Sequence, residues 1–245
     1  MKRQKISALL LRLSVYLATI ITVGALLFVV GYILYKGVPN LSPKLFEWKY
    51  TSDNLSLLPA LLNTILMTLL SLLIAVPLGV FAAIYLVEYA KRGSKLVRFI
   101  RMNAETLAGI PSIVYGLFGM LFFVTALKLG FSMLSGALTI SIMILPVILR
   151  TSEEALMSVP DSYREGSFGL GAGRLRTVFR VVLPDAIPGI LAGVILGVGR
   201  TVGETAALLY TAGTSSDTVS GIMDSARTLS VHMYALSQEG LYINQ

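Results

Sequence analysis

The sequence predicts an all-α membrane protein, a polytopic helical bundle with five apolar spans. Of its 245 residues, 55% are hydrophobic and only 13% are charged, whereas soluble domains carry about 25% charged residues. Long apolar runs recur along the chain, and about 20 such residues cross a hydrocarbon core roughly 30 Å thick. Lysine and arginine gather in alternate segments between these runs. Together the three observations predict one membrane domain over residues 1–245.

Five runs are expected to span the bilayer. The first, near residues 14–35, follows a basic start and is too long for the core of a cleaved signal peptide. The second, near residues 57–87, contains Asn63 and Pro77 and is expected to tilt or bend. The remaining three are expected near residues 106–127, 131–149 and 186–210.

The distribution of positive charge predicts the orientation of the spans. With the N-terminus in the cytoplasm, most lysines and arginines fall in cytoplasmic segments, and the opposite topology would invert this bias. We therefore expect a multi-pass protein of the plasma (inner) membrane with a cytoplasmic N-terminus. The net charge of +7 is explained by this orientation, so no nucleic-acid partner is expected.

The composition argues against chemistry carried out by this chain. It contains no cysteine and a single histidine, His232, which argues against thiolate, iron–sulfur and multi-histidine metal sites. The glycine-rich run at residues 166–173 matches neither the P-loop nor the dinucleotide-binding template. No hydrolase motif with a nucleophile is present either. We expect no enzyme, no metal, no cofactor and no ATP site in this chain.

Two charged residues, Arg200 and Glu204, lie inside the fifth span. Their i, i+4 spacing predicts that they share one face of a helix and can pair. Charge at this depth usually faces the bundle interior or an aqueous path. We expect a path for an anion, in which Arg200 attracts the solute and Glu204 orients the arginine and limits its affinity. Thr201 and Thr205 could add hydroxyl donors, and the alternative is an ion pair that fastens two helices.

Residues 150–184 are expected to form two or three short helices on the cytoplasmic face. Residues 151–154 have the pattern of a capped helix start, and Pro160 is expected to end that helix. A second helix is expected from Asp161, and a third over residues 174–182. Such helices dock into grooves of partner proteins or lie on lipid.

This segment resembles the EAA loop of ABC importer permeases. That loop reads Glu-Ala-Ala, three residues, Gly, nine residues, then Ile-x-Leu-Pro. The matching positions here are Glu165, Gly171, Leu183 and Pro184, while Gly166, Ser167 and Val181 replace the two alanines and the isoleucine. The resemblance implies that residues 150–184 form the loop on which a cytoplasmic ATPase docks.

Two other segments are similar to the phosphate importer permeases of the Pst type. Residues 108–116, AGIPSIVYG, are similar to their third-span signature and include Pro111 and Ser112. Residues 199–209, GRTVGETAALL, are similar to their fifth-span signature, and the ending resembles the A-type subunit more than its C-type partner. Family permeases carry an arginine and a glutamate at the positions of Arg200 and Glu204, and both are considered important for phosphate passage.

The resemblance implies the type I ABC importer permease (MetI-like) fold with six helices. It implies a permease subunit that forms half of the path of an ATP-driven phosphate importer. Its partners would be a C-type permease, a cytoplasmic ABC ATPase dimer that binds the ATP, an extracytoplasmic phosphate-binding protein and the lipid bilayer. No apolar run remains for a sixth span, so we expect this chain to lack it. The alternatives are a permease for sulfate, molybdate or phosphonate, and a membrane scaffold.

Overall fold

The computed structural model describes residues 2–51, 54–91 and 93–239, and these contain helices, turns and loops but no β-strand. The chain divides into two compact units, Met1–Phe46 and Glu47–Gln245. The single domain expected over residues 1–245 therefore stays a prediction.

The first unit is built on one long helix. Helix α1 (Lys2–Gly37) is followed by two 3₁₀ turns, η1 (Val38–Asn40) and η2 (Pro43–Phe46). Its apolar part is long enough to cross a bilayer, and none of that part is buried within the molecule. Exposed apolar side chains along a whole helix are stable in lipid but not in water. The first predicted span is thus confirmed as a helix of suitable length and composition.

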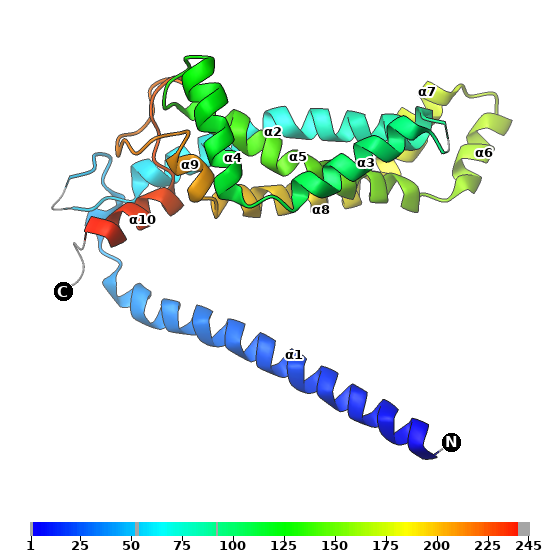
Figure 1. The fold of residues 1–245 in the computed structure, drawn as a ribbon, viewed down its shortest axis with the longest axis horizontal. Coiled ribbons are helices and arrows are strands. Elements are labelled where there is room, and N and C mark those ends of the chain that lie inside the picture. The colour runs from blue at the N-terminus through cyan, green and yellow to red at the C-terminus, as the bar shows by residue number, and fades with distance from the viewer. Residues whose placement is uncertain (1, 52–53, 92, 240–245) are drawn as a thin grey trace. The chain divides into compact units, whose positions relative to one another are not determined.

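The second unit contains nine helices and three π-helical segments among its described residues (Figure 1). In chain order they are α2 (Leu58–Ile84), η3 (Tyr85–Tyr89), α3 (Lys95–Ala108), α4 (Ser112–Gly119), η4 (Met120–Ala126), α5 (Met133–Ser158), α6 (Asp161–Gly169), α7 (Arg174–Thr177), η5 (Val178–Val182), α8 (Leu183–Val202), α9 (Ala206–Leu209) and α10 (Leu229–Glu239). Helices α6 and α7 lie at one end of this unit, and α4, α9 and α10 lie at the other (Figure 1).

Helix α5 is the centre of the bundle. About 67% of its most apolar stretch is buried, against 28% for the corresponding stretches of the α2 and α8 spans. Small residues allow the close packing. A Cβ on Gly79 of α2 would lie 2.8 Å from Ile148 of α5, and a Cβ on Gly189 of α8 would lie 2.6 Å from Ala155. The glycines of α8 that face α5 therefore serve helix approach.

The structure confirms the second, fourth and fifth predicted spans as helices, with changed limits. Four helices of the described chain, α1 included, are long and apolar enough to span a membrane, and a bent pair makes a fifth. The fourth span continues nine residues beyond residue 149, to Ser158. The fifth belongs to a helical run from Arg174 to Val202, and ends eight residues before the predicted limit at residue 210.

The third predicted span is not one straight helix. Helices α3 and α4 meet at an angle of 102° across residues 109–111. Pro111 disfavours the helical conformation for the preceding residue and has no amide to donate, so the helix breaks here. The basic segment before this span, which had no predicted structure, forms most of α3.

The capped helix start expected at residues 151–154 is wrong. Helix α5 runs through this segment without a break. The Thr151 hydroxyl donates to the carbonyl of Val147 at 2.9 Å, which is the bond of a threonine inside a helix. The predicted end at Val159 and Pro160 and the new helix at Asp161 are confirmed.

Candidate functional site

Arg200 lies in the last turn of α8, near the middle of the bundle. One turn earlier, Gly197 faces Leu72, Ile144 and Ile148, whose side-chain atoms lie 3.6 to 3.9 Å from where its Cβ would be. Leu72 is close to the midpoint of α2, and the two isoleucines flank the midpoint of α5. Arg200, one turn after Gly197, therefore lies near the level of the middle of α2 and α5.

The side of α8 around Arg200 is open in this subunit. Arg200 is half-buried, and its neighbour Gly199 has no atom within 4 Å of a Cβ position. Arg200 forms no ion pair among the residues that the structure describes. Within the described part of this subunit, no carboxylate neutralises the Arg200 guanidinium.

Glu204 does not share a helix face with Arg200, contrary to the prediction. Helix α8 ends at Val202, and Glu204 follows the C-cap residue Gly203. The buried Glu204 carboxylate instead accepts a hydrogen bond from the amide of Ala207 at 3.0 Å, at the start of α9. The i, i+4 rule needs a continuous helix, and the glycine-containing break at residues 203–205 removes it. The Ser230 hydroxyl donates to the Glu204 carbonyl at 2.6 Å and fixes the break further.

The two threonines do not form the predicted strip of donors. Thr201 is buried, and its hydroxyl donates to the carbonyl of Gly197 at 2.9 Å, within α8. Thr205 is half-buried and precedes α9 as its N-cap residue, without a capping bond from its side chain. A threonine inside a helix can satisfy its hydroxyl locally, so i+1 spacing from a charge gives no information on where it points.

Pro111 and Ser112 lie at the bend between α3 and α4. Pro111 is exposed with an extended backbone, and Ser112 begins α4. One turn further, the hydroxyl of Tyr115 donates to the carbonyl of Leu107 at 2.7 Å, which closes the bend from inside. Tyr115 also lies within electrostatic range of the Arg200 guanidinium.

The third-span and fifth-span signatures meet in the structure. A Cβ on Gly116 would lie 2.9 Å from the Cα of Ala207 and 3.3 Å from the ring of Tyr210. The backbone of α4 thus rests directly on α9, immediately after Glu204. Tyr115 and Gly116 belong to the third-span signature, but a tyrosine and a glycine in an apolar run carry no signal that marks them as contact residues.

The residues of the predicted ATPase-docking loop lie at the opposite end of the bundle. Glu165 is exposed on α6, and Leu183 and Pro184 begin α8. Gly171 has a φ of 83°, a left-handed conformation that glycine adopts without strain. Gly166 has open space around its Cβ position, so the alanine of the family pattern would fit there.

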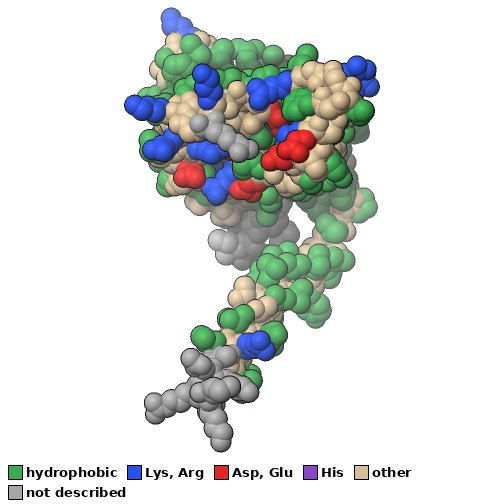
Figure 2. All heavy atoms as spheres, turned by 90° about the vertical axis from the view of Figure 1, so that its right-hand side faces the viewer, with side chains coloured by type: hydrophobic (Ala, Val, Ile, Leu, Met, Phe, Trp, Pro, Cys, Tyr) green, Lys and Arg blue, Asp and Glu red, His purple; other side chains and the backbone are tan. Residues whose placement is uncertain are grey.

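Positive side chains gather around this end of the molecule. Figure 2 shows lysine and arginine over the face where α6 and α7 lie, with a few acidic side chains among them. A cavity of about 690 Å³ lies here, lined on several sides by Lys91, Arg101, Arg164 and Arg174. No group of metal-binding side chains occurs in the described part of the chain.

The fold and the two sites define a class: a helical membrane protein with a charged residue midway along its bundle and a short-helix loop at one end. The chain belongs to the family described as binding-protein-dependent transport system inner membrane component, whose profile matches residues 75–237. It is therefore a permease subunit of an ABC importer.

Curated relatives are similar over much of the chain. The probable ABC transporter permease protein YqgI of Bacillus subtilis (strain 168) is 35% identical over 226 residues, which cover 86% of this chain and 76% of that protein. The phosphate transport system permease protein PstA of Pasteurella multocida (strain Pm70) is 37% identical over 206 residues, 83% of this chain and 72% of that protein.

Other relatives match a smaller share of their own length. The PstA homolog of Mycoplasma pneumoniae (strain ATCC 29342 / M129 / Subtype 1) is 35% identical over 71% of this chain, which spans 28% of that protein. A solved structure of the inward-facing MetNI methionine ABC transporter aligns with a TM-score of 0.49 at 20% identity, over 76% of this chain and 87% of that chain.

Proposed function

We propose that this chain is the A-type membrane subunit of an ATP-driven phosphate importer. Relatives that cover most of the chain include a phosphate transport system permease, and the chain shares with that family its helical core. The subunit would supply half of the path across the membrane and would make or break no covalent bond.

The position of Arg200 carries the proposal. A guanidinium in mid-membrane is costly unless it faces water or a counter-charge, and Arg200 has an open side and no carboxylate partner in the described chain. The planar fork of an arginine matches the oxygens of phosphate. An anion that crosses between two permease subunits would neutralise Arg200 on its way.

The remaining partners follow from the two ends of the bundle. The exposed α6, with Glu165 on its surface, would dock on a cytoplasmic ATPase dimer that binds the ATP, so this chain would need no cofactor of its own. A C-type permease would cover the open side of α8, and a phosphate-binding protein would deliver the anion at the end near α9 and α10. The distribution of lysine and arginine along the sequence supports a cytoplasmic N-terminus for this subunit.

The test is phosphate uptake by the complete importer in proteoliposomes. We expect Arg200→Ala to abolish uptake of radiolabelled phosphate while the complex still assembles. The matched control is Arg98→Ala, because Arg98 is an exposed cation on α3 whose side chain makes no ion pair in the described chain. Normal uptake by the Arg200→Ala importer would refute the role given to this residue.

Competition separates phosphate from other oxyanions. Unlabelled phosphate should inhibit uptake strongly, whereas stronger inhibition by sulfate, molybdate or a phosphonate would assign another substrate to the same fold. A pull-down with an ABC ATPase tests the coupling role, since a membrane scaffold would capture none.

A further inference from the structure

The helix α6 is held to the rest of the molecule by very few side chains. Seven of its nine residues are exposed, and only Arg164 and Ser167, one turn apart, are half-buried. The Ser167 hydroxyl lies 2.8 Å from the hydroxyl of Thr177, so it joins α6 to α7. In the described chain, the side-chain hydrogen bonds from α6 toward the membrane helices all come from Arg164.

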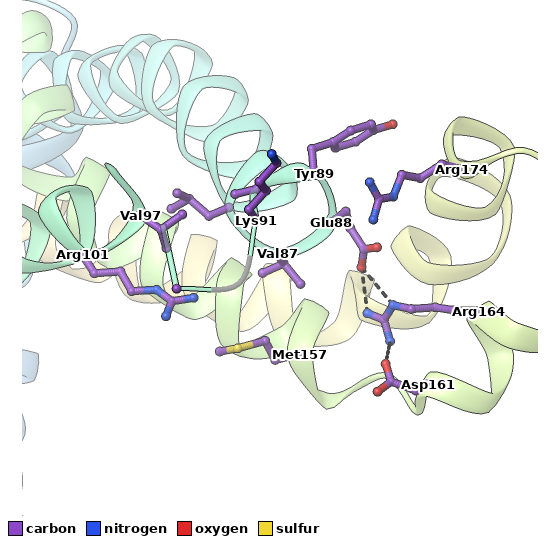
Figure 3. A pocket seen from close by; sticks show the side chains of 13 residues that line it. Val87, Glu88, Tyr89, Lys91, Val97, Arg101, Met157, Asp161, Arg164 and Arg174 are labelled. Carbon is purple, nitrogen blue, oxygen red and sulfur yellow. Dashed lines mark hydrogen bonds and ion pairs between the residues drawn. The ribbon is translucent and has the colours of Figure 1, made fainter. Parts of the chain in front are cut away.

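Arg164 joins three segments at one point. Its Nε and Nη2 groups donate to the carboxylate of Glu88 at 3.1 and 2.8 Å. Two further bonds reach the end of α5, where Nη2 donates to the carbonyl of Leu156 at 2.8 Å and Nη1 to that of the C-cap residue Val159 at 2.7 Å. Nη1 also donates to the Asp161 carboxylate at 3.3 Å, within α6. A single guanidinium thus ties α6 to the C-terminal ends of both α2 and α5. Figure 3 shows its two bonds to Glu88.

Glu88 is built into the end of the α2 helix. It lies in the π-helical turn η3, directly after α2, and only 8% of it is exposed. A buried carboxylate without a cation is strongly unfavourable, so η3 and α6 are held in one relative position while Arg164 stays in place. Extra turns of π-helix occur often at functional positions.

The cavity of about 690 Å³ lies beside this ion pair, and residues of η3, α5 and α6 line it (Figure 3). Because this cavity separates α6 from η3, the ion pair between Arg164 and Glu88 is the main polar contact between them. A weaker contact lies nearby, where the Arg174 guanidinium of α7 is 5.7 Å from the ring centre of Tyr89. Both contacts from the loop therefore end on the same short turn after α2.

We infer that Arg164 is the positioning residue that transmits movement of α6 to the membrane helices α2 and α5, through its ion pair with Glu88. The inference rests on the proposed function, because it takes α6 as the element that the ATPase moves. Arg164 comes directly before Glu165, the first residue of the docking motif. Arg164 therefore contacts the membrane helices, while Glu165 would face the ATPase. Movement of α6 would then tilt α2 and α5 with it.

The experiment compares ATP hydrolysis with phosphate uptake in the reconstituted importer. We expect Glu88→Gln to keep ATP hydrolysis but to lower the phosphate moved per ATP by about tenfold, a typical size for coupling between two sites. Arg164→Lys should lower the ratio as well, since an ammonium cannot reach all three segments at once. The matched control is Glu153→Gln, which removes the ion pair between the buried Glu153 of α5 and the more exposed Arg101 of α3 and does not touch α6.

An unchanged ratio in Glu88→Gln, or an equal loss in Glu153→Gln, would overturn the inference. Failure of both Glu88→Gln and Arg164→Lys to assemble would also overturn it, because the pair would then serve folding alone.

A distance measurement separates this inference from the proposed function. The chain has no cysteine, so spin labels at Tyr163→Cys on α6 and Phe81→Cys on α2 would be unique in this subunit. In the otherwise unchanged importer, their distance should stay constant when ATP binds, and it should change in Glu88→Gln. If ATP changes this distance in the importer with unaltered Glu88, the proposed link between α6 and α2 is refuted, whether or not the importer carries phosphate.

Discussion

The Glu204 carboxylate accepts a hydrogen bond from the Ala207 amide at 3.0 Å, directly after α8 has ended. The acid predicted to pair with Arg200 thus satisfies the backbone of the next helix. This bond fixes the break between α8 and α9, and Arg200 has no carboxylate partner among the described residues.

We expect Glu204→Ala to destabilise the subunit by about 1 kcal/mol, the usual effect of losing a side chain that caps a helix. Glu204→Gln keeps an oxygen acceptor and should be less destabilising. Thermal unfolding of the purified subunit in detergent measures both. Equal stability of the alanine variant and the unaltered chain would show that the cap is unimportant.

Gly116→Ala should disturb the contact between α4 and α9. The added Cβ would meet the Ala207 backbone at 2.9 Å, and overpacking of this kind costs about 1–3 kcal/mol. Gly166→Ala is the matched control, because its Cβ would meet open space. We expect a lower unfolding temperature for the first variant only, and a similar decrease in both would contradict the packing described here.

Tyr115→Phe tests the bend between α3 and α4. The change removes the hydrogen bond to the Leu107 carbonyl and keeps the ring, so the expected loss is about 1 kcal/mol. Because Tyr115 packs in one core cluster with Ala207 and Leu208 of α9, we expect slower phosphate uptake than in a Tyr35→Phe control on the exposed surface of α1. Unchanged stability together with unchanged uptake would argue against a role for this bond.

His232 is expected to make stability depend on pH. Burial and the nearby Arg227 lower the pKa of His232 to about 4, from its usual 6.5. Below pH 6.5 the unfolded chain gains a proton that the folded chain does not, so stability should decrease as the pH falls toward 4. The expected loss is about 2 kcal/mol by pH 5.

The control for this prediction is His232→Phe, which keeps an aromatic ring beside Tyr50 and cannot titrate. Its unfolding temperature should change less between pH 7 and pH 5 than that of the unaltered chain. The same pH dependence in both would assign the effect to other groups.

The spans could be predicted from the sequence because a run of about 20 apolar residues matches the thickness of a bilayer and little else. Residues 14–35, 57–87 and 131–149 lie almost entirely within observed helices. Prediction failed where a local pattern is compatible with two structures. Residues 151–154 have the composition of a capped helix start but lie inside α5. The preceding residues are already helical, and the local pattern of 151–154 does not show this.

The sequence singles out candidate site residues but does not predict their geometry. Arg200 could be found from its charge in an apolar run, whereas the end of α8 at Val202 depends on how α9 packs against α4. Glu88 and Arg164 were missed because each looked like part of a charged loop. Only the fold brings them together, 76 residues apart in the chain.

The end of α8 beside Arg200 has an electrostatic consequence of its own. The aligned peptide dipoles of a helix place a partial negative charge at its C-terminus, and Arg200 lies in that last turn. An incoming anion would therefore meet the attraction of the guanidinium and the repulsion of the helix end together. Such a balance favours a shallow energy well, from which an ion can depart as readily as it arrived.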